Sequence, residues 1–284
     1  ILKGDGKDLQ DETLNKASAV WTRQKKDISD DDYKEFYHHT SHMFDDPWLT
    51  IHNRVEGVQA YTNLLFIPSS QPFDLFQPER KSQLKLYVKR VYITDNCDEL
   101  LPSYFRFVRG IVDSEDLPLN ISREMLQHNP ALAKIKKALT KRIFGELKKK
   151  AEKAPEEYAN FWGNFGAVVK EGIYEDFENR EQLLKIARFR STTADGLISL
   201  MDYAERMKEG QEAIYYITGE DADQIAQSPQ LEGFKAKGVE VLLLTDPVDE
   251  FWVSSVGLYE EKSFKSATRG GADLTNVAGK EKEK

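Results

Sequence analysis

The chain has 284 residues, more than one typical domain needs, and its 40% hydrophobic and 31% charged residues suit a globular protein with a very polar surface. Forty Lys and Arg against 48 Asp and Glu residues give a formal net charge of −8, which argues against nucleic-acid binding by the whole surface, because such binding needs a basic footprint. A single cysteine excludes an internal disulfide framework. The sequence has no apolar run of the roughly 20 residues that span a bilayer, and it has no signal peptide. We therefore expect a cytoplasmic protein.

The two ends are expected to be the least globular parts. Residues 1–17 and 265–284 are polar with few apolar side chains, which predicts a linker at the start and a flexible tail at the end. The first residue is not Met, so we also expect the chain to begin inside a longer protein.

Mixed sheet and helix are expected in the first half. Acidic residues at 27–32 supply helix caps, and apolar residues then recur at helical spacing up to Tyr37. Residues 61–67 predict a strand that Pro68 closes.

Two further strand patterns follow. Residues 84–88 alternate between apolar and polar, Lys89-Arg90 interrupts the pattern and 91–93 resumes it, which predicts a bulge or a strand that leaves the sheet. Residues 105–112 predict another strand, which ends in the acidic turn 113–116.

The middle of the chain is helical. Residues 134–153 carry a dense lysine face, Pro155 should end this helix, and a second helix with an aromatic face makes 155–180 a helical connector. The lysine face admits a protein- or nucleic-acid-binding module as an alternative function, against a plain solvated helix surface. The apolar stripe consists of Leu132, Ile135, Leu139, Ile143 and Leu147.

The last third alternates between strand and helix. Strands at 213–218 and 239–244 flank a helix at 221–227, which predicts a small βαβ unit because parallel strands need a crossover. The chain as a whole is therefore assigned to the α/β class.

Few residues form a recognisable site by themselves. There is no glycine-rich phosphate cradle, and Cys97 lies in the polar segment 94–98 without a motif around it. A hydrolase that uses His38, His42 and Asp45, with zinc as its marker, is a third hypothesis, but exposed histidines at a helix end explain the pattern as well, and no metal site is predicted.

Helix stability does not explain why an arginine stands at position 123. Ser122 can cap a short helix, which places Arg123 in its first turn, where a cation opposes the helix dipole. Contact with an anion such as a phosphate would account for it, because the guanidinium binds such groups in two places. A surface arginine paired with Glu124 or Asp116 remains the alternative.

Residues 113–127, which read DSEDLPLNISREMLQ, closely resemble the catalytic loop of the heat-shock protein 90 chaperones. The resemblance covers about residues 15–265, and residues 206–211 and 52–54 resemble the bacterial form. Other matching stretches appear in the family's order at 21–23, 53–57, 72–76, 86–91, 215–219 and 243–247.

The resemblance implies the family's middle segment. It would comprise a large αβα subdomain with a mixed sheet and the catalytic loop (18–154), the helical connector (155–180) and a small αβα subdomain with a short, mostly parallel sheet (181–264). The N-terminal ATPase domain and the C-terminal dimerisation domain would lie outside this chain. ATP and Mg²⁺ would then bind the full-length protein, while this segment alone needs no cofactor and is not an enzyme.

The family's site residues carry over to matching positions. Arg123 would contact the ATP γ-phosphate, with Gln127 supporting it one helical turn later, so these two are the predicted catalytic residues. Tyr92 would contact the N-terminal domain, and it stands where eukaryotic relatives usually have Phe.

Client contact is expected at four residues. Trp21 matches a tryptophan of client contact and domain signalling, although a partly buried anchor is nearly as good an explanation. Glu250, Phe251 and Trp252 lie in a client-binding region, unless both aromatics belong to the core of the small subdomain. The expected partners are partly folded client proteins and the chain's own terminal domains, with a monomeric fragment, a full-length homodimer, no membrane and no nucleic acid.

Overall fold

The computed structural model describes residues 2–3, 10–11, 19–57, 59–79, 81–121, 123–268, 274 and 277, and the side chain of Arg123 lies outside it. Most of the predicted linker 1–17 and tail 265–284 therefore lies outside the described residues. The backbone groups into two compact units, Ile1–Leu139 and Thr140–Lys284. The division into three parts stays a prediction.

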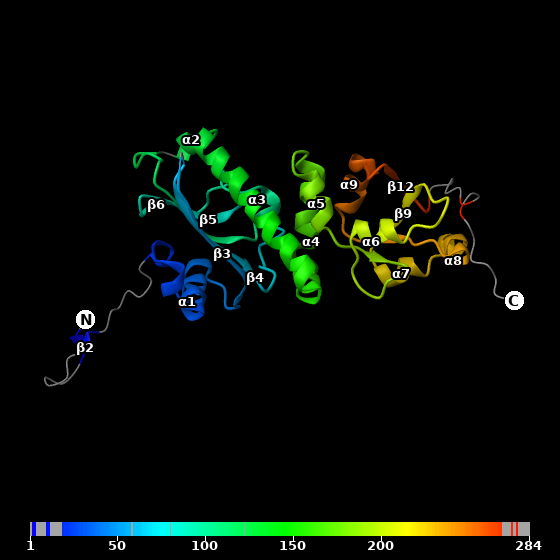
Figure 1. Cartoon of the computed structure of the whole chain (residues 1–284), viewed down its shortest axis with the longest axis horizontal. Coiled ribbons are helices and arrows are strands. Elements are labelled where there is room, and N and C mark those ends of the chain that lie inside the picture. Colours follow the sequence, from blue (N-terminus) through cyan, green and yellow to red (C-terminus); the bar gives the residue numbers. More distant parts are fainter. Residues whose placement is uncertain are drawn as a thin grey trace. The chain divides into compact units, whose positions relative to one another are not determined.

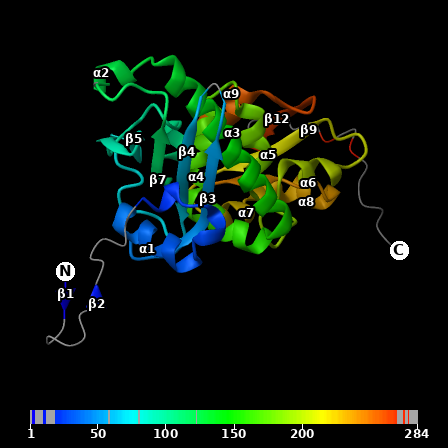
Figure 2. The same cartoon turned by 60° about the vertical axis from the view of Figure 1, so that its left-hand side comes forward.

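The first unit is built on a five-stranded mixed sheet (Figure 1). Its order is β3-β4-β7-β5-β6, and only the pair of β5 and β7 is parallel. Figure 2 shows the long β3–β4 hairpin side by side. The strands are β3 (Pro47–Val55), β4 (Tyr61–Pro68), β5 (Gln83–Val88), β6 (Val91–Thr94) and β7 (Arg109–Ser114).

Helix α1 (Asp30–Ser41) covers part of this sheet. Ser29 caps it, since its hydroxyl accepts from the Asp32 amide while the Asp32 carboxylate accepts from the Ser29 amide, the reciprocal pair of a capping box. The helix buries Phe36 and Tyr37 in a core that it shares with β4 and β7. Short 3₁₀ turns lie at η1 (Val20–Thr22), η2 (Lys25–Asp27) and η3 (Ser103–Phe105).

The break in strand phase at Lys89-Arg90 is a tight hairpin turn between β5 and β6. Both residues have positive φ, 49° and 66°, a conformation in which non-glycine residues are uncommon. A register irregularity also lies between Leu86 and Tyr87. The strand expected from residue 105 begins only at Arg109, because η3 ends at Phe105 and a turn follows it.

Two long helices follow the loop after β7. The predicted stripe is confirmed, since Leu132, Ile135 and the later members of the stripe are all buried on α3 (Pro130–Lys153). Pro155 does stop that helix, but it also occupies the first turn of α4 (Pro155–Glu175), where its missing N–H costs nothing. The four-residue α2 (Arg123–Leu126) precedes them.

The second unit contains another five-stranded sheet, of order β11-β12-β9-β10-β8, with parallel pairs in the centre and antiparallel pairs at both edges. The predicted α/β class and the parallel β9–β10 pair are confirmed. The strands are β8 (Arg190–Ser191), β9 (Ala213–Thr218), β10 (Leu242–Leu244), β11 (Leu258–Tyr259) and β12 (Lys262–Ser266). The helices are α5 (Arg180–Ile186), α6 (Leu200–Glu205), α7 (Ala222–Ala226), η4 (Pro229–Leu231), α8 (Glu232–Lys237) and α9 (Asp249–Val256).

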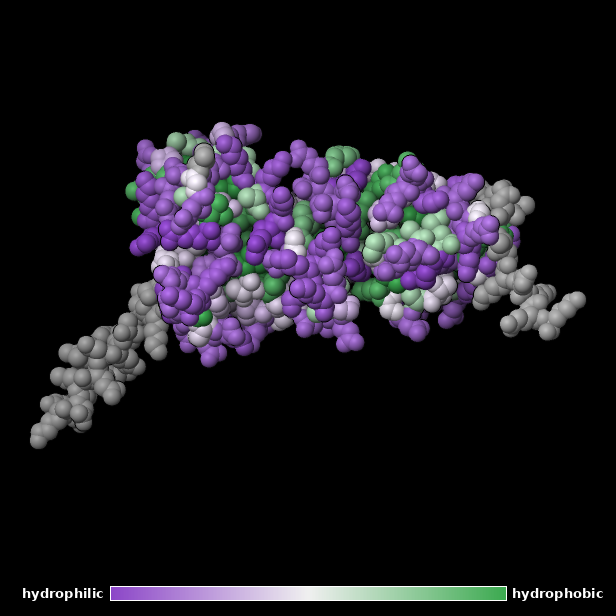
Figure 3. All heavy atoms as spheres, viewed as in Figure 1, coloured by the Kyte–Doolittle hydropathy of each residue, from purple (hydrophilic) through white to green (hydrophobic). Residues whose placement is uncertain are grey.

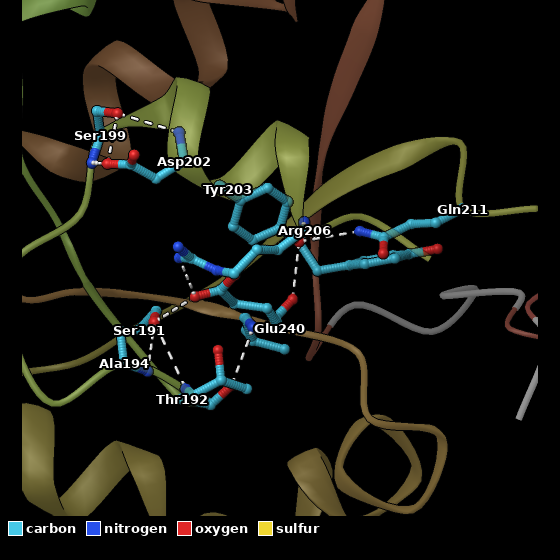
Figure 4. A network of polar contacts seen from close by, with 12 residues as sticks. Ser191, Thr192, Ala194, Ser199, Asp202, Tyr203, Arg206, Gln211 and Glu240 are labelled. Atoms are coloured by element: carbon cyan, nitrogen blue, oxygen red, sulfur yellow. Dashed lines mark hydrogen bonds and ion pairs between the residues drawn. The ribbon is translucent and has the colours of Figure 1, made fainter. Parts of the chain in front are cut away.

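A polar network around the buried Glu240 ties this second unit together (Figure 4). The Arg206 guanidinium donates to both carboxylate oxygens of Glu240, at 3.0 and 2.9 Å, and the Ser191 hydroxyl donates to the same carboxylate at 2.5 Å. Tyr203 donates its hydroxyl to the Glu240 carbonyl at 2.7 Å. The sheet is thereby joined to α6 by charge-assisted hydrogen bonds.

The surface agrees with the composition. Most of the face visible in Figure 3 is hydrophilic. Within the described ranges, no helix combines the length and the apolar character that crossing a membrane requires. Near the N-terminus, β1 (Leu2–Lys3) pairs with β2 (Gln10–Asp11).

Cys97 is fully buried, although the surrounding segment is polar. Its amide donates to the Leu84 carbonyl at 3.2 Å, which draws the turn after β6 onto the sheet. Burial, together with the nearby Glu99 carboxylate, raises the pKa of the thiol to about 12. The buried side chain anchors this loop, and its thiol donates to the Glu99 carboxylate at 3.6 Å.

We expect Cys97 to react with a thiol reagent at pH 8 on the order of a hundredfold more slowly in the folded chain than in urea, because the nucleophile is the thiolate. The rate of release of a chromophoric leaving group measures this. Equal rates in the two states would contradict the burial of Cys97.

Candidate functional site

The loop that leaves β7 is fastened at its base to the turn between β3 and β4. The Glu115 amide donates to the Ala60 carbonyl at 2.9 Å. In return, the Ala60 amide donates to the Asp116 carboxylate at 2.6 Å. This reciprocal pair holds two segments that lie more than fifty residues apart in sequence.

Asp113 fastens the same loop to two further segments. Its side chain is only 5% exposed. One carboxylate oxygen accepts from the Trp21 indole N–H at 2.8 Å, and the other accepts from the Arg90 amide at 3.1 Å. The next residue repeats the link to the β5–β6 turn, because the Ser114 carbonyl accepts from the Lys89 amide at 2.9 Å.

Trp21 is a buried anchor in this structure, with 7% of its surface exposed. Its ring packs against Phe36 and Tyr87, with centroid distances of 5.7 and 4.9 Å. Its carbonyl accepts from Nε2 of His52 at 3.2 Å, and since a carbonyl only accepts, Nδ1 of that ring accepts from the Tyr33 hydroxyl at 2.8 Å. The contacts of this cluster among the described residues join segments of the first unit.

A cavity of about 460 Å³ opens beside Asp113. Three cationic side chains and two carboxylates line it, which makes it strongly polar. Nearby, Tyr92 is 50% exposed and its ring meets the edge of Tyr87 at 5.7 Å. The lining residues are Thr22, Arg54, Thr62, Lys89, Arg90, Asp113 and Glu115.

The loop then runs to the two predicted catalytic residues. Leu117, Ile121 and Leu126 are buried and hold it down, and the Ile121 amide donates to the Pro118 carbonyl at 3.2 Å. The backbone of Arg123 begins α2, and Gln127 is exposed directly after that helix. Ser122, the predicted cap, lies outside the described residues.

The three predicted client-binding residues near position 250 have different environments. Trp252 is fully buried and donates its indole N–H to the Asp249 carboxylate at 2.6 Å. Phe251, one residue earlier on α9, is 61% exposed and meets Tyr174 edge-on at 6.2 Å. Glu250 is exposed and accepts from the Thr218 hydroxyl at 3.3 Å. The alternative of a core position therefore holds for Trp252 and not for Phe251.

Tyr174 has no counterpart among the predicted residues. It is half-exposed on the last turn of α4, directly after the buried Ile173. The partner of Phe251 lies on a different helix, so no sequence spacing could identify the pair.

The two alternative sites find little support in the described part of the chain. Nε2 of His38 contacts the Asp45 carbonyl at 2.8 Å, and no group of three His, Cys, Asp or Glu side chains there is arranged to hold a metal ion. On the lysine face, Arg142 and Lys149 pair with Glu146 at 2.9 and 3.2 Å. This is the pattern of a solvated helix surface with local ion pairs.

Comparison with known proteins agrees with these features. The model of the Hsp90 protein family matches residues 3–284. Chaperone protein HtpG of Paramagnetospirillum magneticum is 63% identical over 96% of this chain, and that of Rhodospirillum rubrum is 59% identical over 96%. The chain spans 44% of the length of each of these relatives. The middle domain of a Plasmodium falciparum heat shock protein superposes with a TM-score of 0.76 at 34% identity, over 88% of this chain and 99% of that one.

The buried His52 beside Trp21 predicts a pH dependence of stability. Burial lowers the pKa of His52 below its ordinary value of 6.5. The unfolded chain then binds the proton more readily than the folded chain, so the free energy of unfolding falls as the pH drops through about 6.5. Urea unfolding between pH 7.5 and 5.5 should show this loss, and His52→Gln should reduce it.

Other groups also titrate between pH 5.5 and 7.5. The pH dependence of the free energy of unfolding must therefore be compared between variants to assign it to His52. His39→Gln, at an exposed position of α1, is the matched control and should keep the full dependence. If the two variants show the same pH dependence, His52 is not the group responsible.

Proposed function

The chain belongs to the Hsp90 family, and we propose that within its full-length protein it acts as the middle domain of an ATP-dependent chaperone of the HtpG type. The proposal has two parts, a contribution to ATP hydrolysis and the binding of client proteins. ATP and Mg²⁺ would bind the N-terminal domain of the longer protein, and a C-terminal domain would form the homodimer. The location would be the cytoplasm.

Arg123 would contribute to hydrolysis by contacting the γ-phosphate. The observation that carries this is the fastened base of the loop, which is bonded to Trp21, to Ala60 and to the Lys89-Arg90 turn. A guanidinium stabilises charge on a transferring phosphoryl group only when it is held in place. Gln127 would support it from the end of α2. Tyr92, half-exposed on β6, would contact the N-terminal domain.

Client binding would use the exposed aromatic face of the second unit. Phe251 and Tyr174 present apolar rings at the surface beside the carboxylate of Glu250. Such an edge suits weak contact with partly folded chains, which expose apolar and basic residues together. Trp252 and Trp21 are buried in this structure, so their part in client binding would require them to move or to act through neighbours.

Arg123→Ala in the full-length chaperone should lower kcat for ATP hydrolysis at least about tenfold with little change in KM, because the arginine acts on the transition state and not on nucleotide binding. Arg142→Ala, which removes an exposed arginine from α3, is the control and should leave turnover unchanged. Steady-state ATPase assays measure both. Unchanged turnover in Arg123→Ala would refute the role of the arginine.

Phe251→Ser should weaken the suppression of aggregation of a diluted, chemically denatured model protein about threefold or more, since it removes a 61% exposed aromatic ring from the proposed client-binding face. Leu258→Ser is the matched control, because Leu258 is 60% exposed in the same unit. Light scattering at increasing chaperone concentration gives the comparison. Equal loss in both variants would show that Phe251 is not a specific contact.

A further inference from the structure

We propose that the Asp113 carboxylate is the positioning residue of the catalytic loop, and that the Trp21 indole sets its place. The inference rests on the proposed role of Arg123. It adds a named contact that links the segment before α1 to the phosphate-binding arginine. In this proposal the buried Trp21 acts by donating one hydrogen bond to Asp113.

The environment of Asp113 is unusual for a carboxylate. It is almost completely buried, and a buried charge requires compensation. Lys89 and Arg90 line the cavity beside it, yet among the described residues neither forms an ion pair with it. The charge is compensated by two neutral donors, the Trp21 indole N–H and the Arg90 amide. Loss of either donor leaves one carboxylate oxygen without a partner.

The two donors reach Asp113 from separate segments. Trp21 lies 92 residues before it in sequence, and Arg90 lies 23 residues before it. The indole is itself held by the rings of Phe36 and Tyr87. Because each oxygen is assigned to one segment, the carboxylate fixes the direction in which the chain leaves β7.

The described part of the loop between Asp113 and α2 is anchored at several points. Asp116 is bonded to the Ala60 amide, and Leu117 and Ile121 are buried. In this proposal Asp113 sets the place from which the anchored loop starts, and thereby the place at which α2 begins. A misplacement of about 1 Å at a catalytic group can cost on the order of a hundredfold in rate. A contact ten residues away can in this way control turnover without touching the nucleotide.

A double-mutant cycle in the full-length chaperone tests the proposal. Asp113→Asn keeps the shape of the side chain. If its oxygen still accepts from the Arg90 amide, its NH2 group faces the Trp21 indole N–H, so two donors meet and the hydrogen bond is lost. Trp21→Phe removes the indole donor and keeps an aromatic ring. Each single variant should lower kcat about fivefold with KM for ATP unchanged. The double variant should be no slower than the slower single one, because both remove the same contact.

Tyr37→Phe is the control for lost stability. It removes another buried hydrogen bond of the first unit, from the Tyr37 hydroxyl to Asp45 at 2.8 Å, and should lower the urea midpoint without lowering kcat. If Asp113→Asn does not fold, the comparison of kcat between Trp21→Phe and Tyr37→Phe still tests the proposal. A kcat within about twofold of wild type for Trp21→Phe, or reductions that multiply in the double variant, would overturn the proposal.

Arg123→Ala, measured in the same assay, separates this inference from the proposed function. Normal turnover in that variant refutes the role of the arginine itself. Reduced turnover there, with normal turnover in the Asp113 and Trp21 variants, refutes only the positioning role.

Discussion

The first unit depends on the close approach of β7 to β4. All six residues of β7 are buried between β4 and β5. Gly110 has φ of +118°, and a Cβ atom there would lie 2.1 Å from the Leu64 carbonyl oxygen. Only glycine fits at this distance, so the pairing in the middle of the sheet fixes where the strand ends and where the loop begins.

Buried carboxylates organise both units, but they are compensated in different ways. In the second unit, Glu240 is paired with Arg206, and Asp249 accepts from Lys170 at 2.6 Å. Ion pairs of this kind are costly to break once a partner is removed. Among the described residues, Asp113 accepts from two neutral donors, each from a different segment. Ion pairs therefore hold the buried carboxylates of the second unit. The loop of the first unit depends on hydrogen bonds to Asp113, and each of these is lost when the one segment that donates it moves away.

The sequence predicts the local elements well because the order of apolar residues along the chain reflects their burial. The helical spacing predicts the stripe of α3, and continuous apolar runs predict the fully buried β4 and the parallel pair of β9 and β10, although β10 begins at Leu242 and not at 239. Contacts between distant segments leave no such trace, so the Trp21–Asp113 bond could not be predicted. Nor could the pattern decide between Phe251 and Trp252, since neighbours on a helix differ by about 100° and either could face the core.

The length of α2 explains why the base of the loop matters. The helix has four residues, and helices shorter than about 12 residues are marginal without tertiary support. Its own hydrogen bonds therefore cannot hold an arginine at a defined place. The support comes from the buried Leu117 and Ile121 before the helix, from the buried Leu126 at its end, and from Asp113 and Asp116 at the start of the loop. An arginine on such a helix is only as well placed as these contacts, so its position can respond to the segments that supply them.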